Sequence, residues 1–257
     1  MRDYGLQERV ALVTGAGSGI GRATAAALGA GAARVFATDL DPATAAETAR
    51  MVQAGGGVAE SAAMDVGDES AVTSAVAACV AAFGRIDILV NNAGIAYPAD
   101  VPDIPLEEWE RSFATNSRGV FLSCKHVIPH MLEAGGGAIV NVASRVGLRG
   151  IPGMAAYSAS KGSVVLLTYS LALEYAQRGI RVNAVCPGPV DTPALERFWP
   201  KFDDPDAVKD RFVSVVPMKR MAAPAEIAEA IMFLASDGAS YITGVALPVD
   251  GGRCAGH

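Results

Sequence analysis

The chain alternates between short runs of apolar, largely β-branched residues and longer stretches rich in alanine and leucine. The short runs predict seven strands, at 9–15, 34–40, 57–66, 85–94, 137–144, 180–188 and 244–252. The longer stretches predict helices at 19–31, 42–55, 69–84, roughly 105–133, and from about 155 to 178. Regular strand–helix alternation predicts an α/β fold, in which one doubly wound, seven-stranded parallel sheet carries helices on both faces. We expect a single domain over 1–257.

One segment, 189–222, interrupts this alternation. It is rich in proline and charge and carries four phenylalanine and tryptophan side chains, Phe198, Trp199, Phe202 and Phe212. Long insertions in compact domains are commonly functional. Ligands of doubly wound sheets bind at the carboxyl ends of the strands, where this segment is expected to lie. We therefore predict a substrate lid here rather than an ordinary surface excursion.

Composition narrows the classes of partner and the compartment. The formal net charge is −6 and no basic run occurs, which argues against nucleic acid and anionic membrane as partners. The four cysteines, Cys79, Cys124, Cys186 and Cys254, form no CxxC pair, so reduced thiols are expected. The first residues lack a signal-type apolar segment, and the alanine-rich runs are too interrupted to span a bilayer. We expect a cytoplasmic protein.

A glycine-rich turn, TGAGSGIG at 14–21, lies between the first strand and the first helix. Gly15, Gly19 and Gly21 would let the backbone approach a pyrophosphate closely and let the helix pack on the strand. The first N–H groups of the helix would face the same anion. Glycines also serve plain turns, so the position between strand and helix is what favours dinucleotide binding.

Asp39 ends the second predicted strand. A carboxylate there can accept hydrogen bonds from adenosine ribose hydroxyls and repel a 2′-phosphate. Leu40, Asp41 and Pro42 follow, so no cation compensates that charge. Asp41 suffices as a helix cap before Pro42, which leaves Asp39 without a structural role. The pattern favours NAD over NADP.

Two pairs of residues four apart could carry chemistry. Tyr157 and Lys161 would share one helix face, as a surface pair or as an acid–base couple. His126 and His130 have a spacing that can bind metal, but KHVIPHM lacks the acidic residue of an H-E-x-x-H site and contains proline. We expect no metal site.

Five motifs taken together carry a family resemblance: TGAGSGIG (14–21), NNAG (91–94), Ser144, YSASK (157–161) and PGPVDT (187–192). Their order and spacing resemble the short-chain dehydrogenase/reductase family, in its TGxxxGxG and YxxxK subgroup of about this length. The resemblance covers essentially the whole chain. It implies a Rossmann-like fold, a dinucleotide cofactor and, commonly, a homotetramer.

The resemblance also implies roles for individual positions. It assigns the catalytic tetrad to Asn116, Ser144, Tyr157 and Lys161. The implied cofactor contacts, in addition to Tyr157 and Lys161, come from residues of six segments: Gly15, Ser18, Gly19 and Ile20; Asp39; Asp65 and Val66; Asn92, Ala93 and Gly94; Pro187 and Gly188; Val190 and Thr192. Asn116 is implied to hold a water that links Lys161 to solvent.

The residue types suit interconversion of an alcohol and a carbonyl compound. A free phenol has a pKa of about 10, too high for an efficient base near neutrality. A nearby ammonium favours the phenolate, so Lys161 is expected to lower the pKa of Tyr157. Ser144 can donate a hydrogen bond to the substrate oxygen as charge develops there.

Three functions stay open at this point. The first is an NAD-dependent alcohol dehydrogenase/ketone reductase for a small-molecule substrate. The second is a 3-oxoacyl-thioester reductase of the same family; such enzymes usually prefer NADPH, which Asp39 opposes. The third is a non-catalytic dinucleotide sensor, for which the tetrad would serve no purpose. For the substrate, the aromatic side chains of 189–222 suit a bulky alcohol, whereas Arg145 or Arg149 could meet an anionic group.

Overall fold

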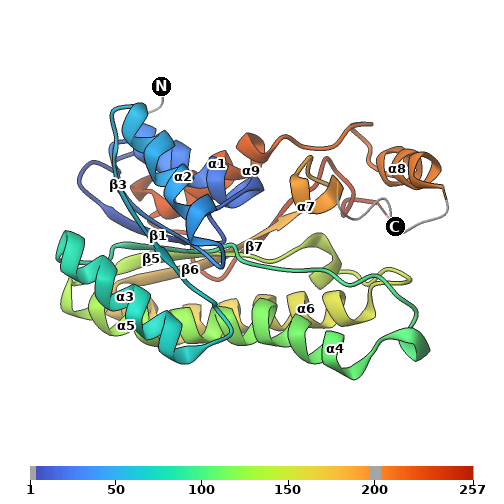
Figure 1. Cartoon of the computed structure of the whole chain (residues 1–257), viewed down its shortest axis with the longest axis horizontal. Coiled ribbons are helices and arrows are strands. Elements are labelled where there is room, and N and C mark those ends of the chain that lie inside the picture. Colours follow the sequence, from blue (N-terminus) through green and yellow to red (C-terminus); the bar gives the residue numbers. More distant parts are fainter. Residues whose placement is uncertain (1–3, 197–203, 257) are drawn as a thin grey trace.

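A computed structural model describes residues 4–196 and 204–256, so that Phe198, Trp199 and Phe202 of the expected lid lie outside the described residues. Seven parallel strands form one sheet in the order β3-β2-β1-β4-β5-β6-β7 (Figure 1). This arrangement confirms the predicted fold class. The strands are β1 (Val10–Thr14), β2 (Arg34–Asp39), β3 (Val58–Ala63), β4 (Ile88–Asn91), β5 (Gly137–Val142), β6 (Ile180–Pro187) and β7 (Ala246–Val249).

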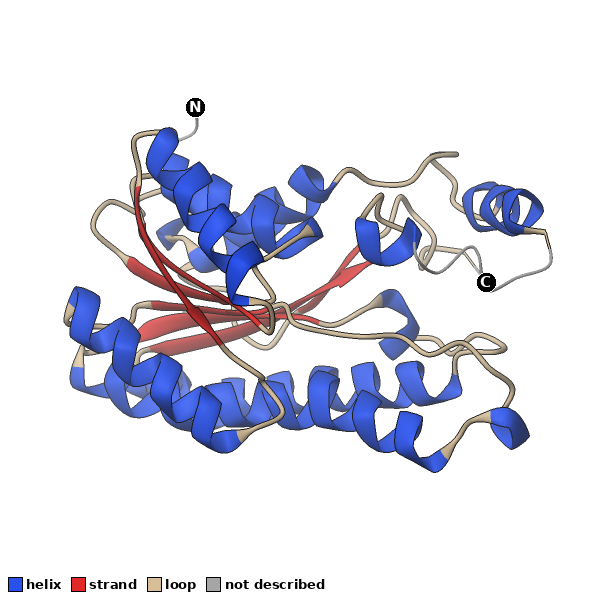
Figure 2. Cartoon of the chain, viewed as in Figure 1, coloured by secondary structure: helices blue, strands red, loops and turns tan. Residues whose placement is uncertain are grey.

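Helices cover both faces of the sheet (Figure 2). One face carries α1 (Gly19–Ala30), α2 (Pro42–Ala54) and α9 (Pro224–Ala235). The other face carries α3 (Glu69–Phe83), α4 (Leu106–Phe113), α5 (Gly119–Glu133) and α6 (Ala155–Tyr175). Two short helices, α7 (Pro193–Glu196) and α8 (Pro205–Ser214), lie beyond the carboxyl end of the sheet, and 3₁₀ turns occupy Val101–Asp103, Arg145–Gly147, Ala176–Arg178 and Asp237–Ala239.

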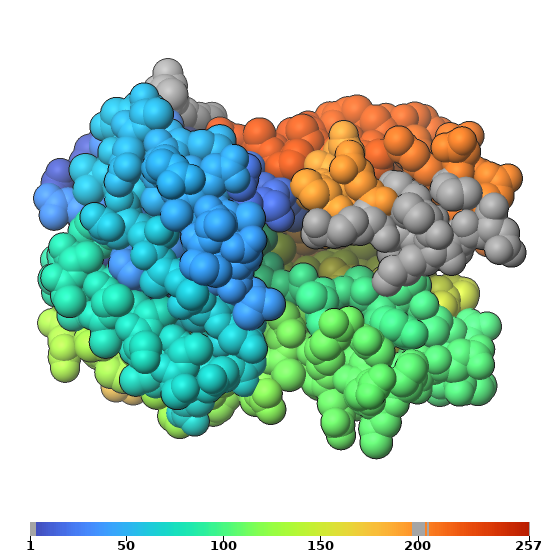
Figure 3. All heavy atoms as spheres, in the orientation of Figure 1, coloured from blue at the N-terminus to red at the C-terminus, as the bar shows by residue number. Residues whose placement is uncertain are grey.

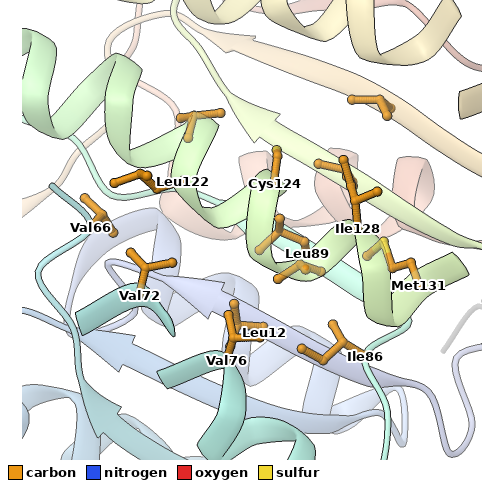
Figure 4. Packing of buried hydrophobic residues seen from close by; sticks show 14 of the residues in the cluster. Leu12, Val66, Val72, Val76, Ile86, Leu89, Leu122, Cys124, Ile128 and Met131 are labelled. Atoms are coloured by element: carbon orange, nitrogen blue, oxygen red, sulfur yellow. The ribbon is translucent and has the colours of Figure 1, made fainter. Parts of the chain in front are cut away.

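Alternation along the strands divides the core between the two faces. In β1, Val10 and Leu12 join the hydrophobic cluster beneath α3, α5 and α6, whereas Ala11 and Val13 join the cluster beneath α1, α2 and α9. Figure 4 shows part of the first cluster, in which Leu12 lies among side chains from neighbouring elements. Because both faces are covered, the central strands are apolar at nearly every position.

The predicted helix at 105–133 forms in three parts rather than as one α-helix. α4 ends at Phe113, the five residues Ala114–Arg118 form a π-helical segment, and α5 follows without a break. Pro129 lies inside α5. A π segment inserts an extra residue in a helix and re-aims the side chains around it, and such segments are frequent at functional sites.

Helix α9 was not predicted, although its sequence carries signals for one. Pro224 occupies the first helical position, where its missing N–H costs nothing. The Glu226 carboxylate accepts the Ala223 N–H at 2.8 Å, which is half of a capping box. Ile227, Ile231 and Leu234 follow at helical spacing and are fully buried. The third strand, predicted at 57–66, ends at Ala63.

The order of the strands creates the crevice that holds the site. From β1 the chain proceeds outward through β2 to β3, then returns to β4 on the other side of β1. The loops after β1 and β4 therefore diverge at the carboxyl edge of the sheet, which is where such folds bind ligands.

Candidate active site

The glycine-rich turn after β1 depends on its glycines. Gly15 and Gly19 have φ of +61° and +53°, a region that other residues rarely adopt. A Cβ on Gly21 would lie 2.1 Å from the Gly15 carbonyl oxygen, and one on Gly15 would lie 2.7 Å from the Ala93 Cα. Ser18 precedes α1 with its side chain unused as a cap, so the first N–H groups of the helix face outward from the turn.

Asp39 holds this turn, which corrects the expectation that it has no structural role. Its carboxylate accepts the Gly17 N–H at 2.8 Å and the Asp41 N–H at 3.2 Å. Asp41 caps α2 through the Ala43 N–H, as its position before Pro42 predicts. A carboxylate has about four acceptor sites, so Asp39 can hold the turn and still accept hydrogen bonds from a ligand.

The segment after β4 lies between the glycine turn and Lys161. The Asn92 amide donates to the carbonyls of Thr14 and Gly15 at 3.0 and 2.8 Å. A Cβ on Gly94 would lie 3.1 Å from the Lys161 Nζ, so glycine at this position leaves room for the lysine.

Asn116 lies at the centre of the π segment and is fully buried. Its side-chain oxygen accepts the Ile95 N–H, and its amide donates to the Ile95 carbonyl, both at 2.8 Å. The same amide donates to the Ser160 hydroxyl at 2.9 Å, and that hydroxyl donates to the Tyr157 carbonyl. Asn116 thus ties the loop after β4 to the first turn of α6.

Ser144, Tyr157 and Lys161 converge from β5 and α6. The Ser144 hydroxyl accepts the Val146 N–H at 3.3 Å, and Ser144 lines the same cavity as Tyr157. The Lys161 ammonium donates to the Val142 carbonyl at 2.7 Å and lies 6.0 Å from the centroid of the Tyr157 ring. The turn after Ser144 packs against the Lys161 backbone, because Gly147 has no Cβ to prevent it.

Burial dominates the electrostatics of this group. It raises the pKa of Tyr157 above 10.0, with the hydrogen bond from Ser144 opposing the change. It lowers the pKa of Lys161 from 10.5 to about 8. The expected lowering of the Tyr157 pKa by Lys161 is absent here, because the ammonium is bonded to Val142 and is distant from the ring. Any such lowering would need further positive charge beside the phenol.

These residues surround one cavity of about 980 Å³. Figure 3 shows a recess between the green segment around α4 and the orange segment around α7. Of the tetrad and the cofactor contacts that the resemblance implies, every residue except Asn116 lines the cavity: Gly15, Ser18, Gly19, Ile20, Asp39, Asp65, Val66, Asn92, Ala93, Gly94, Ser144, Tyr157, Lys161, Pro187, Gly188, Val190 and Thr192. Asn116 lies behind Gly94, with its oxygen 3.3 Å from a Cβ placed there.

The cavity also has lining residues that the motifs did not indicate. They are mostly apolar and include Met154, Leu195 and Phe212, which pack together at the end of the cavity near Tyr157. Arg111 and Arg145 also line it. The sequence indicates Phe212, in the expected lid, and Arg145, beside Ser144. The tertiary fold brings Met154 and Arg111 to the cavity, so the sequence carries no signal for them.

The two histidines with metal-binding spacing, His126 and His130, each lie near a glutamate outside the cavity. His126 lies 3.0 Å from the Glu69 carboxylate, and His130 lies 3.8 Å from Glu133. Within residues 4–196 and 204–256, no group of three or more His, Cys, Asp or Glu is arranged to hold a metal ion. No helix in the described part of the chain is long and apolar enough to cross a membrane.

Comparison with known proteins gives the same family as the motifs. A family model described as enoyl-(acyl carrier protein) reductase matches residues 15–253. The chain is 44% identical to 2-(R)-hydroxypropyl-CoM dehydrogenase of Xanthobacter autotrophicus, over 95% of this chain and 97% of that protein.

Two crystal structures are similar throughout. Levodione reductase has a TM-score of 0.95 at 38% identity, over 98% of this chain and 100% of its own. The 3-ketoacyl-(acyl-carrier-protein) reductase from Brucella melitensis, complexed with NADH, has a TM-score of 0.89 at 42% identity, over 96% and 99%. With the five motifs gathered around one cavity and these relatives alike over nearly their whole length, the chain belongs to the short-chain dehydrogenase/reductase family of oxidoreductases.

Proposed function

We propose that the protein interconverts a secondary alcohol and a ketone, with NAD(H) as the hydride carrier and Tyr157 as the general acid/base. One observation carries this proposal. Ser144, Tyr157 and Lys161 open on the same cavity as the glycine turn and Asp39. A dinucleotide that spans the cavity from Asp39 would therefore end beside the phenol.

The residues present fit a dinucleotide. The walls at Gly15 and Gly19 are bare backbone with positive φ, and the start of α1 offers free N–H groups to a pyrophosphate. Asp39 would hold the adenosine ribose, and Asp65 with Val66 the adenine. Asn92, Ala93 and Gly94 would lie along the cofactor, and Pro187, Gly188, Val190 and Thr192 around the nicotinamide. When bound, the nicotinamide supplies or accepts the hydride.

The chain itself supplies the proton chemistry. Ser144 donates a hydrogen bond to the substrate oxygen as charge develops there. Tyr157 donates a proton to that oxygen in reduction and removes it in oxidation. Lys161 positions the nicotinamide ribose. Asn116 fixes the first turn of α6 and anchors the proton path from Lys161 to solvent.

The segment 189–222 acts as a substrate lid in this proposal. Val190 and Ala222 pair as a single parallel bridge, so the two ends of the segment lie side by side. The Asp191 N–H donates to the Ala222 carbonyl at 2.9 Å, and the Ala222 N–H to the Pro189 carbonyl at 3.0 Å. Leu195 and Phe212, from the two arms of the segment, line the cavity. A lid held at its base in this way can move without disturbing the sheet.

We further propose a cytoplasmic homotetramer. All four cysteines are free thiols, and Cys79, Cys124 and Cys186 are buried, which suits a reducing compartment. The outer faces of α5 and α6 carry large apolar side chains in solvent: Phe121 is 50% exposed, Leu166 66% and Leu173 85%. Apolar patches of this kind mark contacts between subunits.

A substrate screen that follows NADH absorbance tests the proposed function. The panel includes cyclic, aromatic, steroidal, polyol and hydroxy-acid alcohols, with acetoacetyl-CoA for thioester reduction. Turnover of a secondary alcohol by the wild type, with NAD preferred over NADP, is the expected result. Dinucleotide binding without turnover on any substrate would favour a sensor.

The screen also decides for or against the second candidate, a 3-oxoacyl-thioester reductase. Similarity to the Brucella melitensis reductase favours this candidate, and that structure contains NADH. Preference for NAD therefore does not by itself exclude it. A kcat/KM for acetoacetyl-CoA above that for every simple ketone would support it.

Substituting Asp39 is expected to change the cofactor preference. Asp39→Asn keeps an acceptor for the Gly17 N–H but removes the negative charge that would repel a 2′-phosphate. The ratio of kcat/KM for NADP to that for NAD should rise by about tenfold to a hundredfold, since like charges in contact cost several kcal/mol.

Asp41→Asn is the matched control, because Asp41 caps α2 two residues away and does not line the cavity. Its ratio should stay within about twofold of the wild type, since asparagine also caps helices well. An unchanged ratio in Asp39→Asn would show that Asp39 serves only to hold the glycine turn.

A further inference from the structure

Five charged residues line the cavity within the described part of the chain. Four of them have partners in the protein. Asp39 and Asp65 accept the backbone N–H groups of Gly17 and Gly67, Arg111 pairs with Glu108, and Lys161 donates to Val142. The fifth, Arg145, makes no salt bridge or side-chain hydrogen bond with any part of the chain that the structure describes.

Arg145 lies immediately beside the reacting groups. It follows Ser144, and it begins the 3₁₀ turn Arg145–Gly147, which packs on α6 at Lys161. The cavity wall around it includes Tyr157. A substrate whose oxygen meets Ser144 and Tyr157 would therefore lie in the same cavity as Arg145.

No salt bridge in the described part of the chain compensates the charge of Arg145. Burial lowers its pKa from the ordinary value and the second cation Arg253 lowers it further, whereas Cys254 and Asp250 oppose the change. The Asp250 carboxylate forms no ion pair with Arg145, and it accepts the N–H groups of Gly252 at 3.0 Å and Cys254 at 2.7 Å. A half-buried cation without a counter-ion costs free energy, so Arg145 contributes little to stability through its charge.

We propose that Arg145 binds a carboxylate of the substrate, so that this enzyme acts on a hydroxy acid and the corresponding keto acid. The proposal rests on the function proposed above. Guanidinium is the cation best matched to a carboxylate, because its planar fork can make two parallel hydrogen bonds. The carboxylate supplies the counter-ion that Arg145 lacks, and it orients the alcohol carbon toward Tyr157.

Arg145 has two alternative roles, and each leads to a different experimental result. Its aliphatic stem could simply cover apolar surface, in which case removing it would destabilise the fold. It could instead contact the dinucleotide, in which case removing it would weaken cofactor binding for every substrate. The experiment therefore measures stability and cofactor affinity together with turnover.

The test compares acids with their own methyl esters. The substrates are 3-hydroxybutanoate and 4-hydroxycyclohexane-1-carboxylate, each beside its methyl ester, which keeps the carbon frame but removes the charge. The variants are Arg145→Gln, Arg145→Lys and the control Arg149→Gln. Arg149 is four residues further on, exposed, and not part of the cavity wall.

Arg145→Gln should lower kcat/KM for the preferred acid by about tenfold to a hundredfold and leave its ester within about threefold. Arg145→Lys should recover part of the loss, and Arg149→Gln should match the wild type for both. The Kd for the dinucleotide should not change. The melting temperature of Arg145→Gln should be equal to or above that of the wild type, because the uncompensated charge is gone.

A binding measurement separates failure of this inference from failure of the proposed function. Cyclohexanecarboxylate is titrated into the protein saturated with reduced dinucleotide, with nucleotide fluorescence as the readout. Binding that is weakened at least tenfold in Arg145→Gln supports the carboxylate site even if no alcohol is turned over. Equal effects of Arg145→Gln on acid and ester, a lowered melting temperature, or unchanged carboxylate binding would each overturn the inference, whether or not alcohols are turned over.

Discussion

Replacing Tyr157 with phenylalanine is expected to lower kcat by about 10²- to 10⁴-fold, the usual contribution of a positioned acid or base. The phenol lines the cavity beside Ser144, and phenylalanine keeps its ring while removing the transferable proton. The Kd for the dinucleotide should change by less than about threefold. Steady-state turnover and fluorescence titration of the dinucleotide measure the two quantities.

The same phenol predicts how the two reaction directions depend on pH. Burial raises the pKa of Tyr157 above 10.0, so the protonated form dominates across neutral pH. Reduction needs that form and should be nearly constant there. Oxidation needs the phenolate, so its rate should rise with pH until the phenol titrates. The residual oxidation rate of Tyr157→Phe should not show this rise with pH.

Tyr169→Phe is the matched control, since Tyr169 lies on the same helix but on its surface, 36% exposed. Its kcat should equal that of the wild type. Near-full turnover in Tyr157→Phe with bound dinucleotide would show that another group transfers the proton.

Lys161→Met should abolish turnover and yet stabilise the protein in the absence of dinucleotide. Lys161 is only 3% exposed, and burial lowers its pKa from 10.5 to about 8. Each pKa unit of difference between the folded and unfolded chain corresponds to about 1.4 kcal/mol. The charged form therefore costs roughly 3 kcal/mol at neutral pH, of which about 1 kcal/mol is returned by the hydrogen bond to Val142. The free energy of unfolding should rise by about 1–2 kcal/mol.

The stability advantage of Lys161→Met should depend on pH. Between the folded pKa of Lys161, about 8, and its unfolded pKa of 10.5, the unfolded chain holds a proton that the native protein has released. The stability of the wild type should therefore rise with pH across this window, and the advantage of Lys161→Met should shrink. Urea unfolding at neutral pH and near pH 10 measures both effects.

Lys125→Met is the control, because Lys125 is 49% exposed and pairs with Glu69 on the surface. It should keep full activity and change stability by less than about 0.5 kcal/mol. A Lys161→Met protein that is less stable than the wild type at neutral pH would contradict this prediction. It would show that Lys161 stabilises the native fold instead of lowering its stability for the sake of activity.

The motifs indicated residues that the fold gathers around one cavity, but not how those residues hold one another. Three of these features can be predicted from local sequence. The glycine turn lies between a strand and a helix, Asp39 ends a strand, and Tyr157 is four residues before Lys161 on a helix. The bonds from Asn92 to Gly15 and from Asn116 to Ser160 join segments far apart in the chain. Hydrogen bonds between such distant segments produce no periodic pattern in the sequence, so they could not be predicted from it.

Two wrong expectations have the same physical origin. Asp39 holds the glycine turn through the Gly17 N–H, and Gly17 precedes it by a whole helix and strand, so the neighbours of Asp39 in sequence do not reveal this role. Lys161 is expected to act on Tyr157 because four residues make about one turn of a helix. The Val142 carbonyl at the end of β5 instead binds the ammonium. In both cases a tertiary partner outweighs the nearest neighbour in sequence.

The bridge between Val190 and Ala222 has a consequence for how this enzyme can diversify. Because the two ends of the intervening segment are already held together, its length can change with little additional loop-closure entropy. A new segment grafted between Asp191 and Met221 would inherit the same attachment and the same position over the cavity. Under the proposed function, substrate range could therefore change with this segment as a module, while Tyr157 and Lys161 on α6 keep their places.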